Sequence, residues 1–471
     1  MKTSLIYMFL IQALLIVACN KQLDQLPTTS KNLETFLSNE KEAEEYIHAA
    51  YGKLQAKGLY GLYLPAIGEI PSDNTYDEVP ANDAGMYGEL DFFTTVPYND
   101  ILDSFWKSSY SAIQNANVVL NRIDKIKYAK ESVKNNRTGE MKFIRALLYF
   151  NLVRTFGDVP LNTEETTDPN KYFGQGRTAA DTVYAQIVKD LNEAIAVLPA
   201  KTEQPGRVIK TAAQALLGKV YLTLKDYPNA KTQLEAVRTS REHSLQSSIT
   251  TLFDINNKSN NEIIFAVQFA SGINSNSEGS ILFQQFSPSA SQNGAKGHNL
   301  PTKELYSKYT AADPRKGAYV NLAASGSPYC NKYKKPAAPP IADGGSNVVV
   351  LRYADVLLML AEAENELSPA GFTAAADYLN EVRKRAIPSS RSNALTQADM
   401  RAAIDLERRL ELVGEGHRWF DLVRTGAAVS VMNEWFAANG IRVTIDNHNL
   451  LMRIPQSQID TDPAIKQNTG Y

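Results

Sequence analysis

The stretch that decides the fold runs from residue 208 to residue 238 and reads VIKTAAQALLGKVYLTLKDYPNAKTQLEAVR. Its small and large residues have the spacing of a tetratricopeptide repeat, in which two antiparallel helices form a hairpin. Gly218 and Ala230 permit the two helices to approach closely, while Tyr221 and Leu234 fill the groove between them. The stretch therefore predicts a helical hairpin of the kind that stacks into a larger scaffold.

Amphipathic stretches on both sides of this hairpin predict further helices. A looser copy of the repeat lies at 356–382, and others are indicated at 42–57 and 141–156. Apolar residues in these stretches recur at helical intervals, which places them on one buried face. Trp106 and Trp435 are spaced with other apolar residues and are expected in the core. Long helices are predicted near 99–127, 131–156 and 179–198.

Two segments interrupt the helical pattern. The stretch 58–97 is crowded with Gly, Pro, Asp, Asn and Tyr and is expected to be mainly loop. The segment 241–347 is rich in Ser, Asn, Gly and Pro, with one strand predicted at 262–269. Because hairpin helices precede and follow this second segment, we expect it to be an insertion into a single helical domain. The expected fold class is mainly α, with tetratricopeptide-type helical hairpins supporting a loop-rich irregular face with a few short strands.

The N-terminus has the features of an export signal. An apolar run at 5–18 follows Lys2 and is too short to span a membrane comfortably, which is typical of a signal peptide. The run ends Ile16-Val17-Ala18-Cys19, which looks like a bacterial lipobox, in which the cysteine is acylated and becomes the first residue. A plain secretory signal with an incidental cysteine is the alternative. We expect a lipoprotein signal peptide at 1–18, a lipid-anchored tether at 19–38 and a single domain at 39–471.

Composition and motifs argue against several classes of function. The formal net charge is −2, and no basic stripe suited to nucleic acid is evident. The sequence has no G-x-S-x-G elbow, H-E-x-x-H, P-loop or C-x-x-C motif, and its 5 histidines lack metal-ligand spacing. The 2 cysteines are Cys19 and Cys330, so acylation of Cys19 would leave no internal disulfide. We expect no metal, no cofactor and no catalytic residue.

The best acid cluster is Glu407, Glu411 and Glu415, which share one face of a predicted helix. A glycosidase needs two carboxyl groups, one of which its surroundings keep protonated. Arginines close in the sequence favour ionised, paired carboxylates instead, so we predict a structural role for this cluster. These arginines are Arg408, Arg409 and Arg418.

Two polar segments have the residue types of a sugar site. In the loop at 68–77, Asp73 and Asn74 offer acceptors and donors for vicinal hydroxyls, and the ring of Tyr76 can stack on a sugar. Tyr87 follows nearby, as do Phe92 and Phe93. Alternatively, Asp73 and Asn74 simply form the turn. The predicted carbohydrate-binding residues are Asp73, Asn74, Tyr76 and Tyr87, and a second candidate segment at 287–299 contains Gln292, Asn293 and His298.

Ordered blocks along the whole chain resemble the SusD/RagB family. Residues 352–363 read RYADVLLMLAEA, 379–386 read LNEVRKRA, and 407–424 contain ERRLEL and EGHRWFDLVR. The lipobox, the helix from Trp106 and the segment 146–160 agree with the same family. The chain ends with RIPQSQI and QNTGY, where the family usually has P-I-P and Q-N-P-G-Y, so Arg453 and Thr469 depart slightly.

This resemblance implies a function as well as a fold. Members of the family are lipid-anchored at the cell surface, on a Gram-negative outer membrane. They bind glycans, or in some cases peptides, and deliver them to a SusC-like TonB-dependent transporter without catalysis. Ligand residues vary between members, so none is carried over here. The alternative is a peptide- or protein-binding helical-repeat lipoprotein that uses its concave repeat surface.

Overall fold

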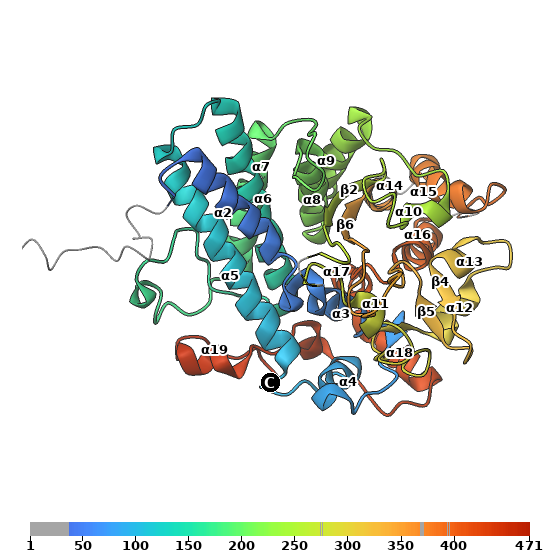
Figure 1. Cartoon of the computed structure of the whole chain (residues 1–471). Coiled ribbons are helices and arrows are strands. Elements are labelled where there is room, and N and C mark those ends of the chain that lie inside the picture. The colour runs from blue at the N-terminus through green and yellow to red at the C-terminus, as the bar shows by residue number, and fades with distance from the viewer. Residues whose placement is uncertain (1–36, 274, 276, 368–371, 393, 395) are drawn as a thin grey trace, which may run out of the picture.

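Figure 1 shows the computed structural model, which describes residues 37–471 apart from 274, 276, 368–371, 393 and 395. Helices predominate, as predicted, and successive long helices contact one another in a continuous series from α2 to α15. This series forms the scaffold. It consists of α2 (Glu40–Lys53), α5 (Asp100–Arg122), α6 (Glu131–Phe156), α7 (Ala180–Val197), α8 (Lys210–Thr223), α9 (Tyr227–Ser240), α14 (Tyr353–Leu367) and α15 (Phe372–Ala386).

Helices α8 and α9 form the hairpin that the spacing of 208–238 predicts. A Cβ atom at Gly218 would lie 2.6 Å from Leu234 Cγ, so the glycine makes the close packing of the two helices possible. Ala230 and Leu234 are fully buried. Asp226 accepts a hydrogen bond from the Asn229 backbone N–H at 3.3 Å and caps α9 where the chain turns. The prediction of a hairpin here is confirmed.

The other segments predicted as repeats are helical, but not each of them packs against the helix that follows it directly in the sequence. α14 and α15 form the hairpin expected at 356–382, while α2 packs against α5, which begins only at Asp100. The stretch between them contains α3 (Tyr63–Glu69) and α4 (Met86–Asp91), where the sequence predicts mainly loop. Every residue of α3 is buried, so tertiary packing overrides the weak helix propensity of its Gly and Pro residues.

The insertion at 241–347 forms the irregular side of the molecule, which lies on the right in Figure 1. The predicted strand is present as β2 (Ile263–Val267), which pairs antiparallel with β6 (Val348–Arg352). Because β6 runs directly into α14, this pairing returns the insertion to the helical scaffold. Two smaller antiparallel pairs are β1 (Thr75–Tyr76) with β3 (Leu300–Pro301), and β4 (Val320–Leu322) with β5 (Pro328–Cys330).

Shorter helices complete the fold. Those of the irregular side are α10 (Ile249–Leu252), α11 (Leu282–Gln285), α12 (Lys303–Lys308) and α13 (Arg315–Ala318). The C-terminal helices are α16 (Gln397–Leu412), α17 (Arg418–Thr425), α18 (Ala428–Ala438) and α19 (Gln456–Thr461). Single turns lie at η1 (Lys57–Gly61), η2 (Asp83–Gly85), η3 (Ile123–Lys125), η4 (Pro169–Lys171) and η6 (Asn447–Leu450).

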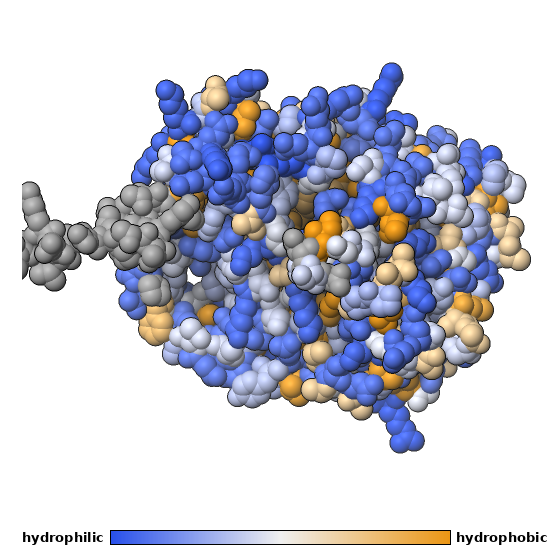
Figure 2. Space-filling view, in the orientation of Figure 1, coloured by the Kyte–Doolittle hydropathy of each residue, from blue (hydrophilic) through white to orange (hydrophobic). Residues whose placement is uncertain are grey.

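The largest hydrophobic core cluster draws on residues from Leu37 to Ile465. Trp106 is buried in it and Trp435 packs against it, as predicted. Cys330 is a buried free thiol. The face in Figure 2 is mainly hydrophilic, with small scattered hydrophobic spots. No helix in the described part of the chain is long and apolar enough to cross a membrane. Cys19, the predicted signal peptide and nearly all of the tether lie outside the described residues.

Candidate functional site

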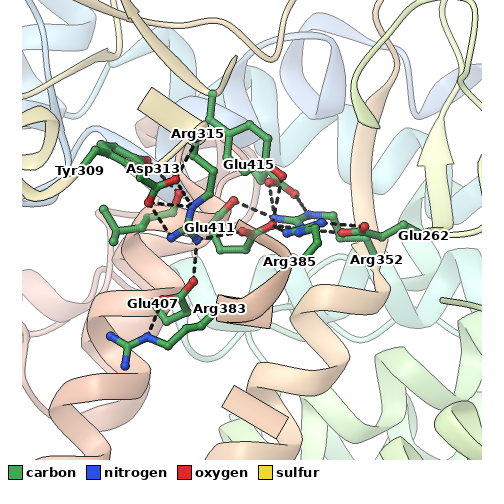
Figure 3. A network of polar contacts seen from close by, with 12 residues as sticks. Glu262, Tyr309, Asp313, Arg315, Arg352, Arg383, Arg385, Glu407, Glu411 and Glu415 are labelled. Carbon is green, nitrogen blue, oxygen red and sulfur yellow. Dashed lines mark hydrogen bonds and ion pairs between the residues drawn. The ribbon is translucent and has the colours of Figure 1, made fainter. Parts of the chain in front are cut away.

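A buried ion-pair network surrounds the acid cluster (Figure 3). Glu407 and Glu411 lie on α16, but that helix ends at Leu412, so the prediction that Glu415 shares its face is wrong. Glu411 is fully buried and accepts hydrogen bonds from Arg315 Nη1 at 3.0 Å and Arg352 Nη1 at 2.8 Å. It also pairs with Arg385. Three cations therefore converge on one carboxylate in the interior. The other carboxylates of the network are Glu262, Asp313, Glu407 and Glu415.

The electrostatics of Glu411 fit a structural role. Burial opposes ionisation, but Arg385, Arg352 and Arg315 outweigh it and hold the pKa of Glu411 well below its ordinary value. A general acid must keep a proton near neutral pH, and this carboxyl does not. The prediction that the cluster serves ion pairing is confirmed.

The partners of the acid cluster differ from those that sequence proximity indicates. Arg408 pairs with Asp355 and Asp421, and Arg418 pairs with Asp73, although both arginines lie close to Glu411 in the sequence. The residues that neutralise Glu411 come from β6, α13 and α15 instead. Arg408 points to a different side of α16 from Glu411, and Arg418 belongs to α17, so proximity along the chain does not decide pairing.

The predicted sugar-binding residues Asp73 and Asn74 have buried side chains. Asp73 accepts hydrogen bonds from Arg418 Nε at 2.7 Å and Nη2 at 3.0 Å, and Arg409 Nη2 lies 3.1 Å from it. Asn74 Oδ1 accepts a hydrogen bond from Arg409 Nε at 2.8 Å. Burial raises the pKa of Asp73, but Arg418 and Arg409 outweigh this effect and lower it overall. These two side chains tie the loop to α16 and α17.

The structure brings together the two polar segments that the sequence singles out. β1 pairs with β3, and the Glu78 backbone N–H donates to Gly297 O at 3.0 Å. The ring of Tyr87 stacks on that of His298 with centroids 3.8 Å apart, and both side chains are buried. His298 Nδ1 lies 2.9 Å from Asp77 Oδ1, and its Nε2 lies 2.8 Å from Asp83 Oδ2. His298 therefore joins the loop at 72–91 to the segment 287–299.

Among the four predicted carbohydrate-binding residues, only Tyr76 has a partly exposed side chain. In the second segment, Gln292 is half-buried and Asn293 is exposed. The ring of Phe93 packs against Trp419 at 5.3 Å, so it contributes to the core. The binding role of Asp73, Asn74, Tyr76 and Tyr87 stays a prediction, and a ligand can reach Tyr76 most directly.

The most exposed large hydrophobic side chain among the described residues is not one of the predicted site residues. Tyr98 lies between α4 and α5 and is 75% exposed. Its position between Pro97 and Asn99 in a polar stretch is a recognisable loop pattern that could have indicated its exposure. Within the described residues, no group of three or more His, Cys, Asp or Glu side chains is arranged to hold a metal ion.

A buried carboxyl pair lies beneath these loops. Asp91 Oδ2 accepts a hydrogen bond from the Asp77 backbone N–H at 3.0 Å. Asp91 Oδ1 and Asp77 Oδ2 are buried and have no hydrogen-bond partner among the described residues. Burial, together with the charge of Asp77, raises the pKa of Asp91 to about 8. Asp91 is therefore protonated in the folded chain at neutral pH.

Asp91→Asn is expected to stabilise the chain increasingly as pH rises from the ordinary range of an aspartate toward 8, where the gain is complete. An aspartate with a raised pKa in the folded state favours folding at low pH and loses that contribution as pH rises toward 8. The amide cannot ionise, so at pH 9 the free energy of unfolding of the variant should be higher than that of the parent by on the order of a few kcal/mol. Urea denaturation at pH 5 and pH 9 measures this. The exposed Asp377→Asn serves as control, and an equal pH dependence of parent and Asp91→Asn would contradict the prediction.

The similarity to known proteins extends over nearly the whole chain. The family model described as "SusD family" matches residues 321–471, and the model described as "Starch-binding associating with outer membrane" matches residues 21–222. SusD-like protein P25 of Formosa agariphila is 26% identical, with 99% of each chain covered. A SusD-like protein of Bacteroides ovatus is 25% identical over 87% of this chain and 80% of its own.

Solved structures share the fold. A laminarin binding SusD-like protein is 30% identical, with 92% of this chain and 100% of its own covered at a TM-score of 0.78. A SusD superfamily protein of Parabacteroides distasonis is 25% identical, with 92% and 99% covered at a TM-score of 0.79. The similarity covers the helical scaffold and the irregular side alike.

Proposed function

The chain belongs to the SusD/RagB family, and from this premise we propose that it binds a glycan at the cell surface without transforming it. Support comes from the relative at 30% identity whose name states that it binds laminarin. The buried acid cluster of Glu407, Glu411 and Glu415 supports a non-catalytic role, because its carboxylates are engaged in ion pairs.

The proposal extends to anchoring and delivery. The lipobox at Cys19 supports attachment to the outer membrane by lipid, and the matched family description names association with that membrane. Two or three acyl chains on one cysteine would anchor the chain stably. Membership of the family supports delivery to a SusC-like TonB-dependent transporter. Mass spectrometry of the native N-terminus tests the anchor, and co-purification from outer membranes tests the partner.

We place the glycan on the loop assembly formed by segments 72–100 and 287–302. The observation that carries this placement is the joining of the two polar segments by β1 and β3, which leaves Tyr76 partly exposed beside them. A tyrosine ring presents an apolar face for a sugar ring and a hydroxyl for hydrogen bonding. Shallow, wet sites of this type bind weakly, because ligand and side chains lose freedom on binding.

Calorimetric titration with laminari-oligosaccharides tests the function and the site together. We expect a dissociation constant between about 10 μM and 1 mM, and at least a tenfold loss in Tyr76→Ala, which is about 1.4 kcal/mol. Tyr172→Ala, a half-buried tyrosine on the loop after α6, is the matched control and should bind normally. Asn74 is a poor target, because its amide holds Arg409.

Three outcomes would count against the proposal. Equal binding by Tyr76→Ala and the parent would place the glycan elsewhere. Binding of peptides with no response to any glycan would favour the helical-repeat alternative. Release of reducing ends during the titration would indicate hydrolysis and contradict a binding-only role. Loss of that release in Glu411→Gln would then assign the hydrolysis to the acid cluster.

A further inference from the structure

A cavity of about 720 Å³ lies away from the loop assembly. It opens between the C-terminal end of α6, the N-terminal end of α7, α17 and the C-terminal segment 447–469. Its volume is in the range of small-molecule sites. No residue of segments 72–100 or 287–302 lines it. Its lining includes Arg154, Arg177, Tyr184, Phe420, Gln467 and Asn468.

Arg154 is a cation without a carboxylate partner in the described structure. Its guanidinium carbon lies 4.0 Å from the ring centroids of both Phe150 and Phe420. Nε donates to Phe150 O at 3.2 Å and Nη2 to Asn151 Oδ1 at 2.7 Å, while Nη1 has no hydrogen-bond acceptor among the described residues. Burial lowers its pKa to about 10, so it stays charged at neutral pH. The sandwiched guanidinium is held rigidly with one edge free.

Arg177 is the second such cation of the cavity. Its Nη1 donates to Asn468 Oδ1 at 2.6 Å and to Asp158 O at 3.3 Å, and it forms no ion pair with any described residue. Among the described residues, Asp158 is the one carboxylate that lines the cavity; it is exposed and accepts a hydrogen bond from the Ala180 backbone N–H. The charge of Asp158 acts on Arg177 from beyond ion-pair distance, so neither arginine is paired with a carboxylate among the described residues.

Other cations in and near this cavity do have carboxylate partners. Arg424 is engaged by Glu362 and Asp421, and His448 lies 2.6 Å from Asp446. The cavity of about 500 Å³ on the other side of Arg424 has its arginines paired with carboxylates. Unpaired guanidinium groups cost energy when buried, so their concentration in one cavity indicates a site for an anionic group.

We propose that this cavity is a second binding site, which takes an acidic saccharide with its carboxylate or sulfate group between Arg154 and Arg177. Guanidinium groups bind both kinds of anion through paired, charge-assisted hydrogen bonds. Tyr184 is half-buried in the lining and offers apolar surface for a sugar ring. The Gln467 and Asn468 amides hold the C-terminal segment of the lining in place, donating to Ile454 O at 2.8 Å and to Phe156 O at 3.0 Å. The choice of a saccharide rests on the proposed glycan function, whereas the anion site rests on the two arginines.

Calorimetric titration of the whole chain tests this site with four probes. They are an oligogalacturonate, a sulfated laminari-oligosaccharide, the matched neutral laminari-oligosaccharide and inorganic sulfate. Arg177→Gln is expected to weaken binding of at least one acidic probe tenfold or more and to leave the neutral probe unaffected. Arg154→Lys, which keeps the charge but not the planar fork, should also weaken it, with melting temperature as the check on folding. Arg241→Gln removes an exposed arginine and is the charge-matched control.

The outcomes separate this site from the loop site. Tyr76→Ala should lose the neutral probe and keep the acidic one. A response to only one acidic probe identifies the anionic group and supports the proposal. Inorganic sulfate binding as tightly as the acidic saccharides would overturn it, because the sugar would then contribute nothing. Unchanged binding of both acidic probes in Arg177→Gln and in a folded Arg154→Lys, or no binding of either by the parent, would also overturn it.

Discussion

Glu411→Ala is expected to lower the free energy of unfolding by about 3–5 kcal/mol or more, because it removes the carboxylate that three buried arginines share and leaves the network with an excess positive charge. Arg315, Arg352 and Arg385 all converge on this carboxylate in the interior. Without it, three cations repel one another where water cannot screen them. Urea denaturation at pH 7 measures the change. Glu45→Gln, which removes an exposed partner of Lys41, is the control and should change stability by less than about 1 kcal/mol.

The same variant should alter the acid limb of the stability curve. The pKa of Glu411 is lower in the folded chain than its ordinary value. Its contribution is therefore complete above the ordinary pKa and is lost as pH falls through the folded pKa. The parent should lose stability below about pH 4.5 more steeply than Glu411→Ala does. Equal urea midpoints for the two proteins at pH 7 would show that the network does not stabilise the fold.

The second large effect is expected at Asp73, where the loop at 71–77 meets the C-terminal helices. Asp73→Ala removes both hydrogen bonds from Arg418 and the contact with Arg409. Arg418 would keep only Asp405, whose side chain is 50% exposed. We expect a loss of about 3–5 kcal/mol in the free energy of unfolding.

A double-mutant cycle with Arg418→Met isolates this pair. The double variant should recover part of the loss, since neither charge is then buried alone. Glycan titration of the same proteins distinguishes whether Asp73 holds the loop in position or contacts the glycan directly. Asp73→Ala should weaken binding only together with stability, whereas Tyr76→Ala should weaken binding alone. A variant Asp73→Ala that keeps its stability and loses its glycan would establish direct contact, as the sequence predicts.

Local patterns in the sequence were sufficient to predict the helical scaffold. The hairpin at 208–238 follows from spacings of three and four residues, since these place Gly218, Ala230 and Leu234 on facing helix surfaces. Helix α6 occupies the predicted 131–156, and α7 lies within one residue of its predicted ends. Helix formation depends on neighbours in the chain, so one segment carries the information.

The lining of the candidate sites depends on contacts between distant segments. Asp73 and Asn74 have the residue types of a sugar site, but their partners Arg418 and Arg409 lie more than 330 residues away in the sequence. His298 and Tyr87 also have the residue types of a sugar site, but their rings stack on each other in the interior. Arg154 and Arg177 look like ordinary helix and loop residues in the sequence, and only the folded chain shows that neither forms an ion pair with a described residue. The sequence by itself determined the helical hairpins and the family, because both rest on local patterns of residues. Tertiary structure alone decided which polar side chains are neutralised inside and which face a ligand, because burial and charge pairing depend on segments that meet only after folding.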